Sequence, residues 1–305
     1  MSEMSKGVAA VLGSAMIWGV SPIFYKALSH VPALDVLAHR MIWSLIFFGG
    51  VLAMQGRLHE IRPAFSDKRK ALMLVAASVI IMLNWALFIW AVQAGLTTQS
   101  SLGYYIYPLL SVLLGFVLFR EALTRVQWGA IGLVTFAVLL LTWGVGVLPW
   151  VALVLAVSFA SYGVVKKQLD LGPVLSVTIE VLLLVPLAVI FLAYRYQAGA
   201  DIFGGDATSL TLLVLSGPMT AFPLVLFGYG TRRMKMASVG LILYVNPTLQ
   251  FACAVFVFGE PFSGWHLAAF TLIWIALAIY SGAAWRQDKA RRTASRQASA
   301  SGTAV

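Results

Sequence analysis

The feature that most constrains this chain is a series of apolar stretches, each long enough to cross a bilayer as a helix. Ten stretches of roughly twenty residues recur between Gly7 and Trp285 with almost no charge inside them. Backbone groups in lipid must find hydrogen bonds within the chain, so these stretches are expected to be α-helices. Of the 305 residues, 61% are hydrophobic and 10% are charged, whereas about a quarter are charged in soluble proteins. The sequence therefore predicts an all-α polytopic membrane protein with ten transmembrane helices.

The breaks between the apolar stretches set the expected spans to within a few residues. We predict spans near residues 7–26, 33–54, 71–93, 98–119, 126–144, 147–165, 173–194, 208–230, 236–258 and 265–285. The residues left over are too few for an added soluble domain. The segment 286–305 is rich in Arg, Ala and Ser, and this composition predicts a disordered tail.

The net charge of +10 is concentrated in alternate connections between the predicted spans. Basic residues gather at Lys6, in 57–70, in 120–125, in 166–167, in 232–235 and in 286–296. The opposite side has only Lys26 and Arg195, and Arg40 falls inside a span. Basic loops stay in the cytoplasm during insertion, so both termini are predicted to be cytoplasmic. The positive charge thus indicates topology and contact with anionic lipid rather than nucleic acid.

The two halves of the chain resemble each other. A shift of 139 places Pro108 on Pro247 and Glu121 on Glu260, and a shift of 140 places Lys26 on Lys166 and Arg40 on Glu180. Each half, 1–145 and 146–285, then holds five predicted spans. Because five is odd, the second half would enter the membrane from the opposite side.

An inverted repeat of this kind is typical of secondary transporters. It places a site near the bilayer midplane between the halves, and the halves rock to expose it on alternate sides. The sequence therefore predicts a transporter that works by alternating access around a central cavity.

Four segments carry a family resemblance. PALDVLAHRMIWSL (32–45), NWALFIWAVQAG (84–95), SLGYYIYPLLSVLLG (101–115) and LYVNPTLQFACAVFVFGEPF (243–262) resemble the RarD branch of the EamA-type drug/metabolite transporter superfamily. The likeness extends from Lys6 to about Trp285. It implies two repeats of five helices, a multi-pass protein of the bacterial inner (cytoplasmic) membrane, and export of a small metabolite or drug. It implies no particular substrate.

The prolines of the fourth and ninth spans indicate where a substrate would bind. Proline removes a backbone hydrogen bond, and the freed carbonyl in lipid must face protein or a wet cavity. We predict helix breaks at Pro108 and Pro247. Residues three and four apart share a helix face, and two polar faces result: one has Tyr104, Tyr107 and Ser111, and the other has Asn246 and Gln250 beside Tyr244. These are the predicted substrate-binding residues; the alternative is that the prolines are only packing kinks.

Three further spans offer candidate cavity walls. Trp18, Ser21 and Tyr25 follow helical spacing in the first span, and Tyr162 lies in the corresponding region of the sixth. Their alternative role is packing between helices. Asn84, with Trp85 beside it, lies inside the third span, where a buried amide needs a partner. Substrate contact and a fixed hydrogen bond between helices are both open for Asn84.

Charged residues near the span ends are candidates for gating or coupling. They form one group at the outer side and another at the inner side: Lys26, Asp35, His39 and Arg40, then Lys166 and Glu180. We predict that Asp35 pairs with Lys26, His39 or Arg40, and that Glu180 pairs with Lys166. Such clusters are either gates that form alternately or permanent pairs at interfacial depth. His39 and Glu180 are the candidates for carrying protons.

The acidic residues all lie in tails, loops or the outer thirds of predicted spans. Exporters of cations commonly use a carboxylate near the midplane, so the favoured substrate is neutral, zwitterionic or amphipathic.

The lone Cys253 and four scattered histidines predict no metal site and no cofactor, and motifs of an intramembrane enzyme do not occur. A sensor or structural subunit without transport is the remaining alternative. Gly129, Gly132 and Ala276 are candidates for helix contacts in a homodimer.

Overall fold

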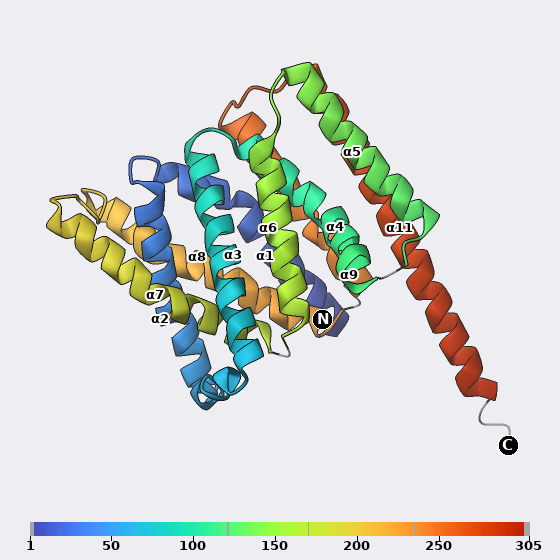
Figure 1. Cartoon of the computed structure of the whole chain (residues 1–305), viewed down its shortest axis with the longest axis horizontal. Coiled ribbons are helices and arrows are strands. Elements are labelled where there is room, and N and C mark those ends of the chain that lie inside the picture. The colour runs from blue at the N-terminus through green and yellow to red at the C-terminus, as the bar shows by residue number, and fades with distance from the viewer. Residues whose placement is uncertain (1–2, 121, 170, 235, 302–305) are drawn as a thin grey trace.

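The computed structural model describes residues 3–120, 122–169, 171–234 and 236–301, and all regular structure in these residues is helical (Figure 1). Ten helical segments are long and apolar enough to cross a membrane. They coincide with the ten spans expected from the sequence to within a few residues. The all-α class and the number of spans are therefore confirmed.

Five helices form the first half, and a broken ninth span distinguishes the second half. The first half contains α1 (Glu3–Ala27), α2 (Ala33–Met54), the 3-10 turns η1 (Leu58–Glu60) and η2 (Pro63–Phe65), α3 (Lys68–Gln93), α4 (Thr97–Phe119) and α5 (Arg125–Val145). The second half contains α6 (Trp150–Lys167), α7 (Pro173–Gln197), α8 (Ala207–Thr231), α9 (Met236–Leu243), α10 (Val245–Ala252), the π-turn η3 (Cys253–Val257) and α11 (Gly264–Ser301). The ninth span, Ser238–Val257, is built from α9, α10 and η3.

Local sequence signals begin and end several helices. At the start of α5, Thr124 and Gln127 form a capping box, which satisfies two backbone N–H groups that the helix leaves unpaired. The same helix ends at Gly146, whose φ of 76° is favourable only for a residue without a side chain. Asp206 accepts hydrogen bonds from the backbone N–H groups of Thr208 and Ser209 and so begins α8.

The two prolines expected to break helices behave differently. The break predicted at Pro108 is wrong, because α4 continues through that residue from Thr97 to Phe119. In the ninth span, α9 ends before Tyr244, and Pro247 lies in the first turn of α10. Proline is tolerated in a first turn because its missing N–H would have no partner there. The hydroxyl of Ser101 donates to the carbonyl of Pro247 at 2.8 Å.

Helices of the two halves pack against one another throughout the bundle. The main partners are α1 with α8, α3 with α6, α2 with α7 and α8, α4 with α6, α1 with α10, and α5 with α11. One apolar core joins α4, α5, α6 and α11, and another joins α1, α2, α3, α6, α7 and α8. Figure 1 shows α5 and α11 side by side at one edge of the bundle.

The small residues considered for a homodimer differ in their surroundings. Gly129 and Gly132 on α5 have open space where a side chain would project. Ala276 on α11 is fully buried in the core shared with α5. Ala276 therefore serves packing within the chain, and a homodimer through α5 stays a prediction.

The helix α11 is longer than its predicted span. It runs through Ser301, whereas the sequence predicts a disordered tail from residue 286. Ala, Arg and Gln are strong helix formers, so their abundance after residue 285 favours continuation of the helix. Residues 302–305 lie outside the part of the chain that the structure describes.

We expect Gly217→Ala to destabilise the bundle. A methyl group at Gly217 on α8 would overlap the backbone carbonyl carbon of Trp43 on α2, so the two helices must separate. Overpacking of this kind costs about 1–3 kcal/mol, which thermal unfolding of the detergent-solubilised protein would detect. Gly132→Ala is the matched control, because open space surrounds it. Equal melting temperatures for the two variants would contradict the close approach of α2 and α8.

Candidate functional site

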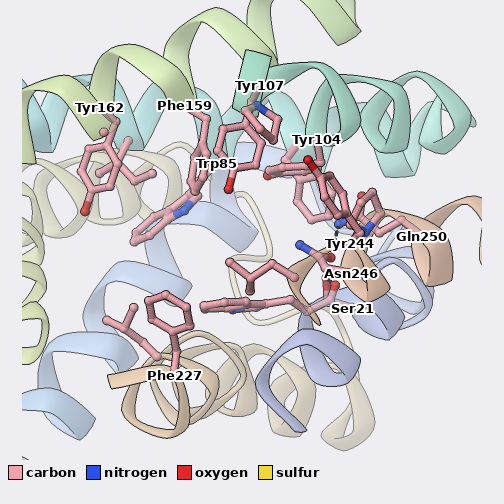
Figure 2. Close-up of a pocket in the computed structure, with 18 of the residues that line it drawn as sticks. Ser21, Trp85, Tyr104, Tyr107, Phe159, Tyr162, Phe227, Tyr244, Asn246 and Gln250 are labelled. Carbon is pink, nitrogen blue, oxygen red and sulfur yellow. Dashed lines mark hydrogen bonds between the residues drawn. The ribbon is translucent and has the colours of Figure 1, made fainter. Parts of the chain in front are cut away.

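A cavity of about 650 Å³ lies inside the helix bundle. Helices α1–α4 and α6–α11 all contribute to its wall. The wall is mainly apolar and aromatic, and Figure 2 shows the aromatic side chains on opposite sides of the space. Clefts of this size and character are the usual binding sites for small molecules.

Most of the residues singled out in the sequence line this one cavity. They come from six separate spans and are Trp18, Ser21, Tyr25, Arg40, Trp85, Tyr104, Tyr107, Pro108, Ser111, Tyr162, Lys166, Tyr244, Asn246, Pro247 and Gln250. The faces of α1, α4, α6 and α10 chosen by helical spacing thus line one cavity. Contact of these residues with a substrate stays a prediction.

Two polar groups on facing helices are available to a ligand. The hydroxyl of Tyr107 has no hydrogen-bond partner among the described residues, and the ring packs edge-on against Phe159 at 5.0 Å between centroids. The side-chain oxygen of Asn246 accepts from Gln250 at 2.8 Å, which leaves its amide nitrogen for another partner. Figure 2 shows the Tyr107 hydroxyl and the Asn246 nitrogen both directed into the space. The hydroxyls of Ser21 and Ser111 instead bond to backbone carbonyls of their own helices.

Several lining residues were missed in the sequence. Phe159 contacts Tyr104, Tyr107 and Tyr162, and it links the aromatic residues of α4 and α6. It lies three residues before Tyr162, so helical spacing from that residue would have found it. Phe227 and Thr220 also line the wall, but no match between the two halves of the sequence singled them out.

Asn84 does not line the cavity. It is buried, and its amide nitrogen donates to the Leu155 carbonyl at 3.1 Å and to the Ser158 hydroxyl at 2.8 Å. Of the two interpretations left open by the sequence, the structure has the fixed hydrogen bond that joins α3 to α6.

The partner predicted for Asp35 is wrong. Its carboxylate pairs with Arg195 at 3.0 Å, and no salt bridge joins it to Lys26, His39 or Arg40 within the described residues. The reason is that α2 packs against α7, which brings the last turn of α7 next to the first turn of α2. His39 lies one turn further along the same face of α2, but its Nε2 atom is bonded to the carbonyl of Ile202.

Lys26 and His39, which the sequence grouped with Asp35, are also bonded away from the cavity. The ammonium group of Lys26 donates to the carbonyl of Gln93 at 3.3 Å and approaches that of Val92 at 3.5 Å. The Nε2 atom of His39 lies 2.9 Å from the carbonyl of Ile202, so this nitrogen is held as a donor. Neither residue belongs to the cavity wall.

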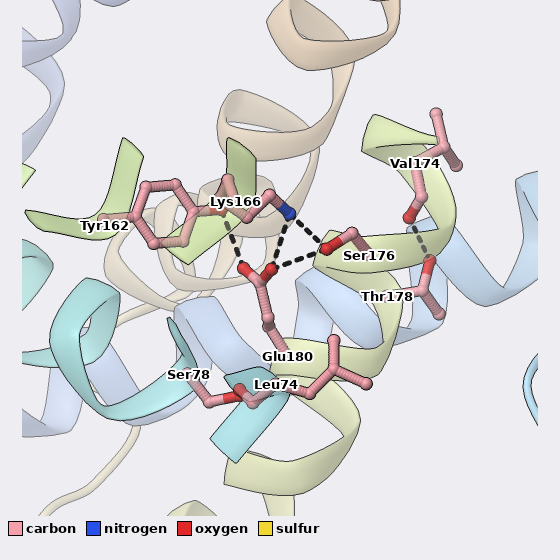
Figure 3. Close-up of polar contacts among 8 residues, drawn as sticks. All are labelled: Leu74, Ser78, Tyr162, Lys166, Val174, Ser176, Thr178 and Glu180. Atoms are coloured by element: carbon pink, nitrogen blue, oxygen red, sulfur yellow. Dashed lines mark hydrogen bonds and ion pairs between the residues drawn. The ribbon is translucent and has the colours of Figure 1, made fainter. Parts of the chain in front are cut away.

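The predicted pair of Lys166 and Glu180 is present and joins the end of α6 to α7 (Figure 3). The ammonium group lies 2.6 Å from the carboxylate, which is fully buried. Glu180 also accepts hydrogen bonds from Tyr162 and Ser176 at 2.8 Å each. Lys166 and Tyr162 line the cavity, so Glu180 stands directly behind its wall. Whether this cluster opens during transport stays a prediction.

Polar contacts close the bundle at the end where Lys26 lies. Gln93 donates to the carbonyls of Leu28 and Val31 at 3.0 and 3.1 Å. The carboxylate of Glu260 accepts from the backbone N–H groups of Thr97 and Thr98 at 2.7 Å each, where the positive end of the α4 dipole favours an anion. The bonds of Glu260 tie the end of the ninth span to α4. Its repeat counterpart Glu121 lies outside the described residues.

The cavity wall extends toward the opposite end. It includes Lys166 at the end of α6, Pro173 at the start of α7, Gly240 on α9 and Ser281 on α11. Glu260 marked only the repeat in the sequence, and its bonds to Thr97 and Thr98 had no local sequence signal because those residues lie far away along the chain.

Comparison with known proteins now identifies the family. The transporter YojE of Bacillus subtilis, itself uncharacterized, is 37% identical, and the match covers 92% of this chain and 95% of YojE. Protein RarD of Escherichia coli K12 is 36% identical over 91% of this chain and 94% of RarD. The profile of the EamA-like transporter family matches residues 5–143. The chain belongs to the RarD-like branch of the EamA-like transporters.

The resemblance found in the sequence is thus confirmed, and this RarD-like protein is a multi-pass membrane transporter. A crystal structure with 14% sequence identity has a TM-score of 0.61 over 92% of this chain and 97% of that chain, which supports the fold alone.

We expect Glu180→Gln to destabilise this RarD-like protein by about 3–5 kcal/mol, because the change leaves the charge of Lys166 without its partner. The matched control is Glu60→Gln, which removes a partly exposed pair with Arg57 worth at most about 1 kcal/mol. Unfolding of purified protein measures both. If the two variants lose equal stability, the buried cluster does not hold α6 to α7.

Proposed function

We propose that this protein is a secondary transporter that exports a small neutral, zwitterionic or amphipathic metabolite or drug by alternating access. The observation that carries the proposal is the central cavity, whose wall reaches one end of the bundle while polar contacts join the helices at the other. The export direction rests on the family resemblance.

The packing of the helices supports an inverted repeat of two five-helix units, 1–145 and 146–285. If α1 to α5 correspond to α6, α7, α8, the ninth span and α11, most contacts come in equivalent pairs. The contact of α1 with α8 matches that of α6 with α3, and the contact of α4 with α6 matches that of the ninth span with α1. The family profile covers 5–143, close to the first unit, which also supports this division.

The basic loops support an orientation in which the open end faces the cytoplasm. Lys166 and Lys167 end α6 at that side, and α1 begins there. Both chain termini are then cytoplasmic. In this state the cavity admits a solute from inside the cell, as the first step of export requires.

The chemistry of the wall supports binding through a few directed hydrogen bonds within an aromatic enclosure. Tyr107 on α4 and Asn246 on α10 belong to opposite units and face the same space, so one solute would contact both. Rocking of the units would then break the bonds of Glu260 to α4 and close the cytoplasmic end. We assign any coupling to protons to Glu180 rather than His39, because Glu180 bonds to two cavity residues.

The proposal predicts that Tyr107→Phe and Asn246→Ala impair export without preventing insertion. Each change removes one hydrogen bond of about 0.5–1.5 kcal/mol, so export should fall about two- to tenfold. Untargeted mass spectrometry of the medium, with cells that overproduce the wild-type protein or a variant, measures the exported solute.

Tyr194→Phe is the control, because Tyr194 is exposed at the end of α7. Membrane levels of all variants are compared by immunoblot. Unchanged export by both cavity variants would overturn the assignment of this cavity. No change in any solute on overproduction of the wild-type protein would count against transport itself and favour a sensor or structural subunit.

A further inference from the structure

Arg40 is a buried cation in the cavity wall. It lies on α2 and is only 7% exposed. Its Nε atom donates to the Thr220 hydroxyl at 2.7 Å, and the guanidinium carbon lies 4.2 Å from the centre of the Trp85 ring. The side chain is thus held in place by a neutral acceptor and an aromatic face.

No carboxylate neutralises Arg40 within the described part of the chain. Asp35 and Glu180 are fully buried, but each pairs with a different cation, Arg195 and Lys166. The described lining residues of the cavity include two cations, Arg40 and Lys166, and no acid. Because Lys166 has Glu180 behind it, the wall retains one uncompensated positive charge.

The internal repeat makes this charge more informative. A shift of 140 matches Lys26 with Lys166 and Arg40 with Glu180. In the second half, the lysine and the acid form an ion pair. In the first half, a cation occupies the position of the acid, so the structural pair is replaced by a free charge. An unpaired charge inside a membrane protein is unfavourable and marks a functional position.

We propose that the transported solute is an organic monoanion, a carboxylate attached to a flat apolar body, and that Arg40 binds the carboxylate. A guanidinium group offers a planar pair of donors that fits a carboxylate, and the aromatic wall encloses the apolar part. The wall offers no described acid to an ammonium group, which disfavours amines and zwitterions. This inference rests on the proposed function and, of its three substrate classes, selects the amphipathic one.

The test uses matched probes that differ only in charge. Purified full-length protein is titrated with benzoate, 2-naphthoate and indole-3-carboxylate, and with the three corresponding amides, by calorimetry or thermal shift. We expect at least one carboxylate to bind about tenfold more tightly than its amide, equivalent to about 1.4 kcal/mol. Sodium chloride at the same concentration is the inorganic control and should not reproduce the stabilisation.

Variants of Arg40 then test whether this side chain causes the preference for carboxylates over amides. Arg40→Gln should lower carboxylate affinity to that of the amide and leave amide affinity unchanged. Thr220→Val keeps the charge and should keep the preference. If Arg40→Gln does not fold, Arg40→Lys replaces it, and the loss of paired donors should weaken carboxylate binding several-fold without affecting the amide.

Four results would overturn the inference. They are equal binding of acids and amides, no binding by any carboxylate, stabilisation by chloride equal to that by the carboxylates, and a preference for carboxylate over amide that survives Arg40→Gln. These outcomes differ from failure of the proposed function. In one such case acids and amides bind equally and both lose binding in Tyr107→Phe, and in another export depends on Tyr107 although no carboxylate binds. Either result would refute an anionic substrate and leave transport through this cavity intact.

Discussion

A bilayer offers no hydrogen-bond partner to the peptide backbone, and this constraint determines where a binding site is possible in the chain. Nine of the ten spans are continuous helices within the described residues. The ninth span along the chain is interrupted at Tyr244, between α9 and α10, although the Tyr244 N–H and carbonyl still bond to Leu241 and Thr248. The interruption lies at the cavity, with Tyr244 in the wall and a hydroxyl from α4 on the carbonyl of Pro247. The site therefore coincides with the place where helical regularity fails and backbone groups can be satisfied by protein or by a wet cavity.

Buried charges are the second organising element. Asp35, Glu180 and Glu260 are each neutralised within the fold, by Arg195, by Lys166 and by two backbone N–H groups of α4. These contacts join α2 to α7 through Asp35, α6 to α7 through Glu180, and the end of the ninth span to α4 through Glu260. Arg40 differs because, among the described residues, a neutral hydroxyl and aromatic rings hold it and no carboxylate does. Charges paired inside the protein hold helices together, whereas an unpaired charge on a cavity wall acts on whatever enters the cavity.

Much of this arrangement could be predicted from the sequence. Apolar length predicted the ten spans, and helical spacing around Pro108 and Pro247 predicted the residues by which α4 and the ninth span line the cavity, because both depend on local periodicity. The partner of Asp35 and the direction of Asn84 could not be predicted, since they depend on how each helix is rotated against neighbours far away in the sequence. The same limit applies to Glu260, whose partners on α4 lie more than a hundred residues earlier. Pro108 shows that a helix-breaking residue need not interrupt a helix.

The central claim is that the two ends of the bundle open alternately around one cavity. Spin labels at Ser29 and Ser263 report on the closed end, and labels at Gln55 and Gln168 report on the open end, in a Cys253→Ser background. Double electron–electron resonance in lipid nanodiscs gives the two distance distributions, with wild-type Glu260 and with Glu260→Gln. This variant weakens the contact that holds the closed end together, so the experiment needs no known substrate. The account predicts that Glu260→Gln lengthens the first distance and shortens the second. Unchanged distributions, or widening of both ends together, would contradict it.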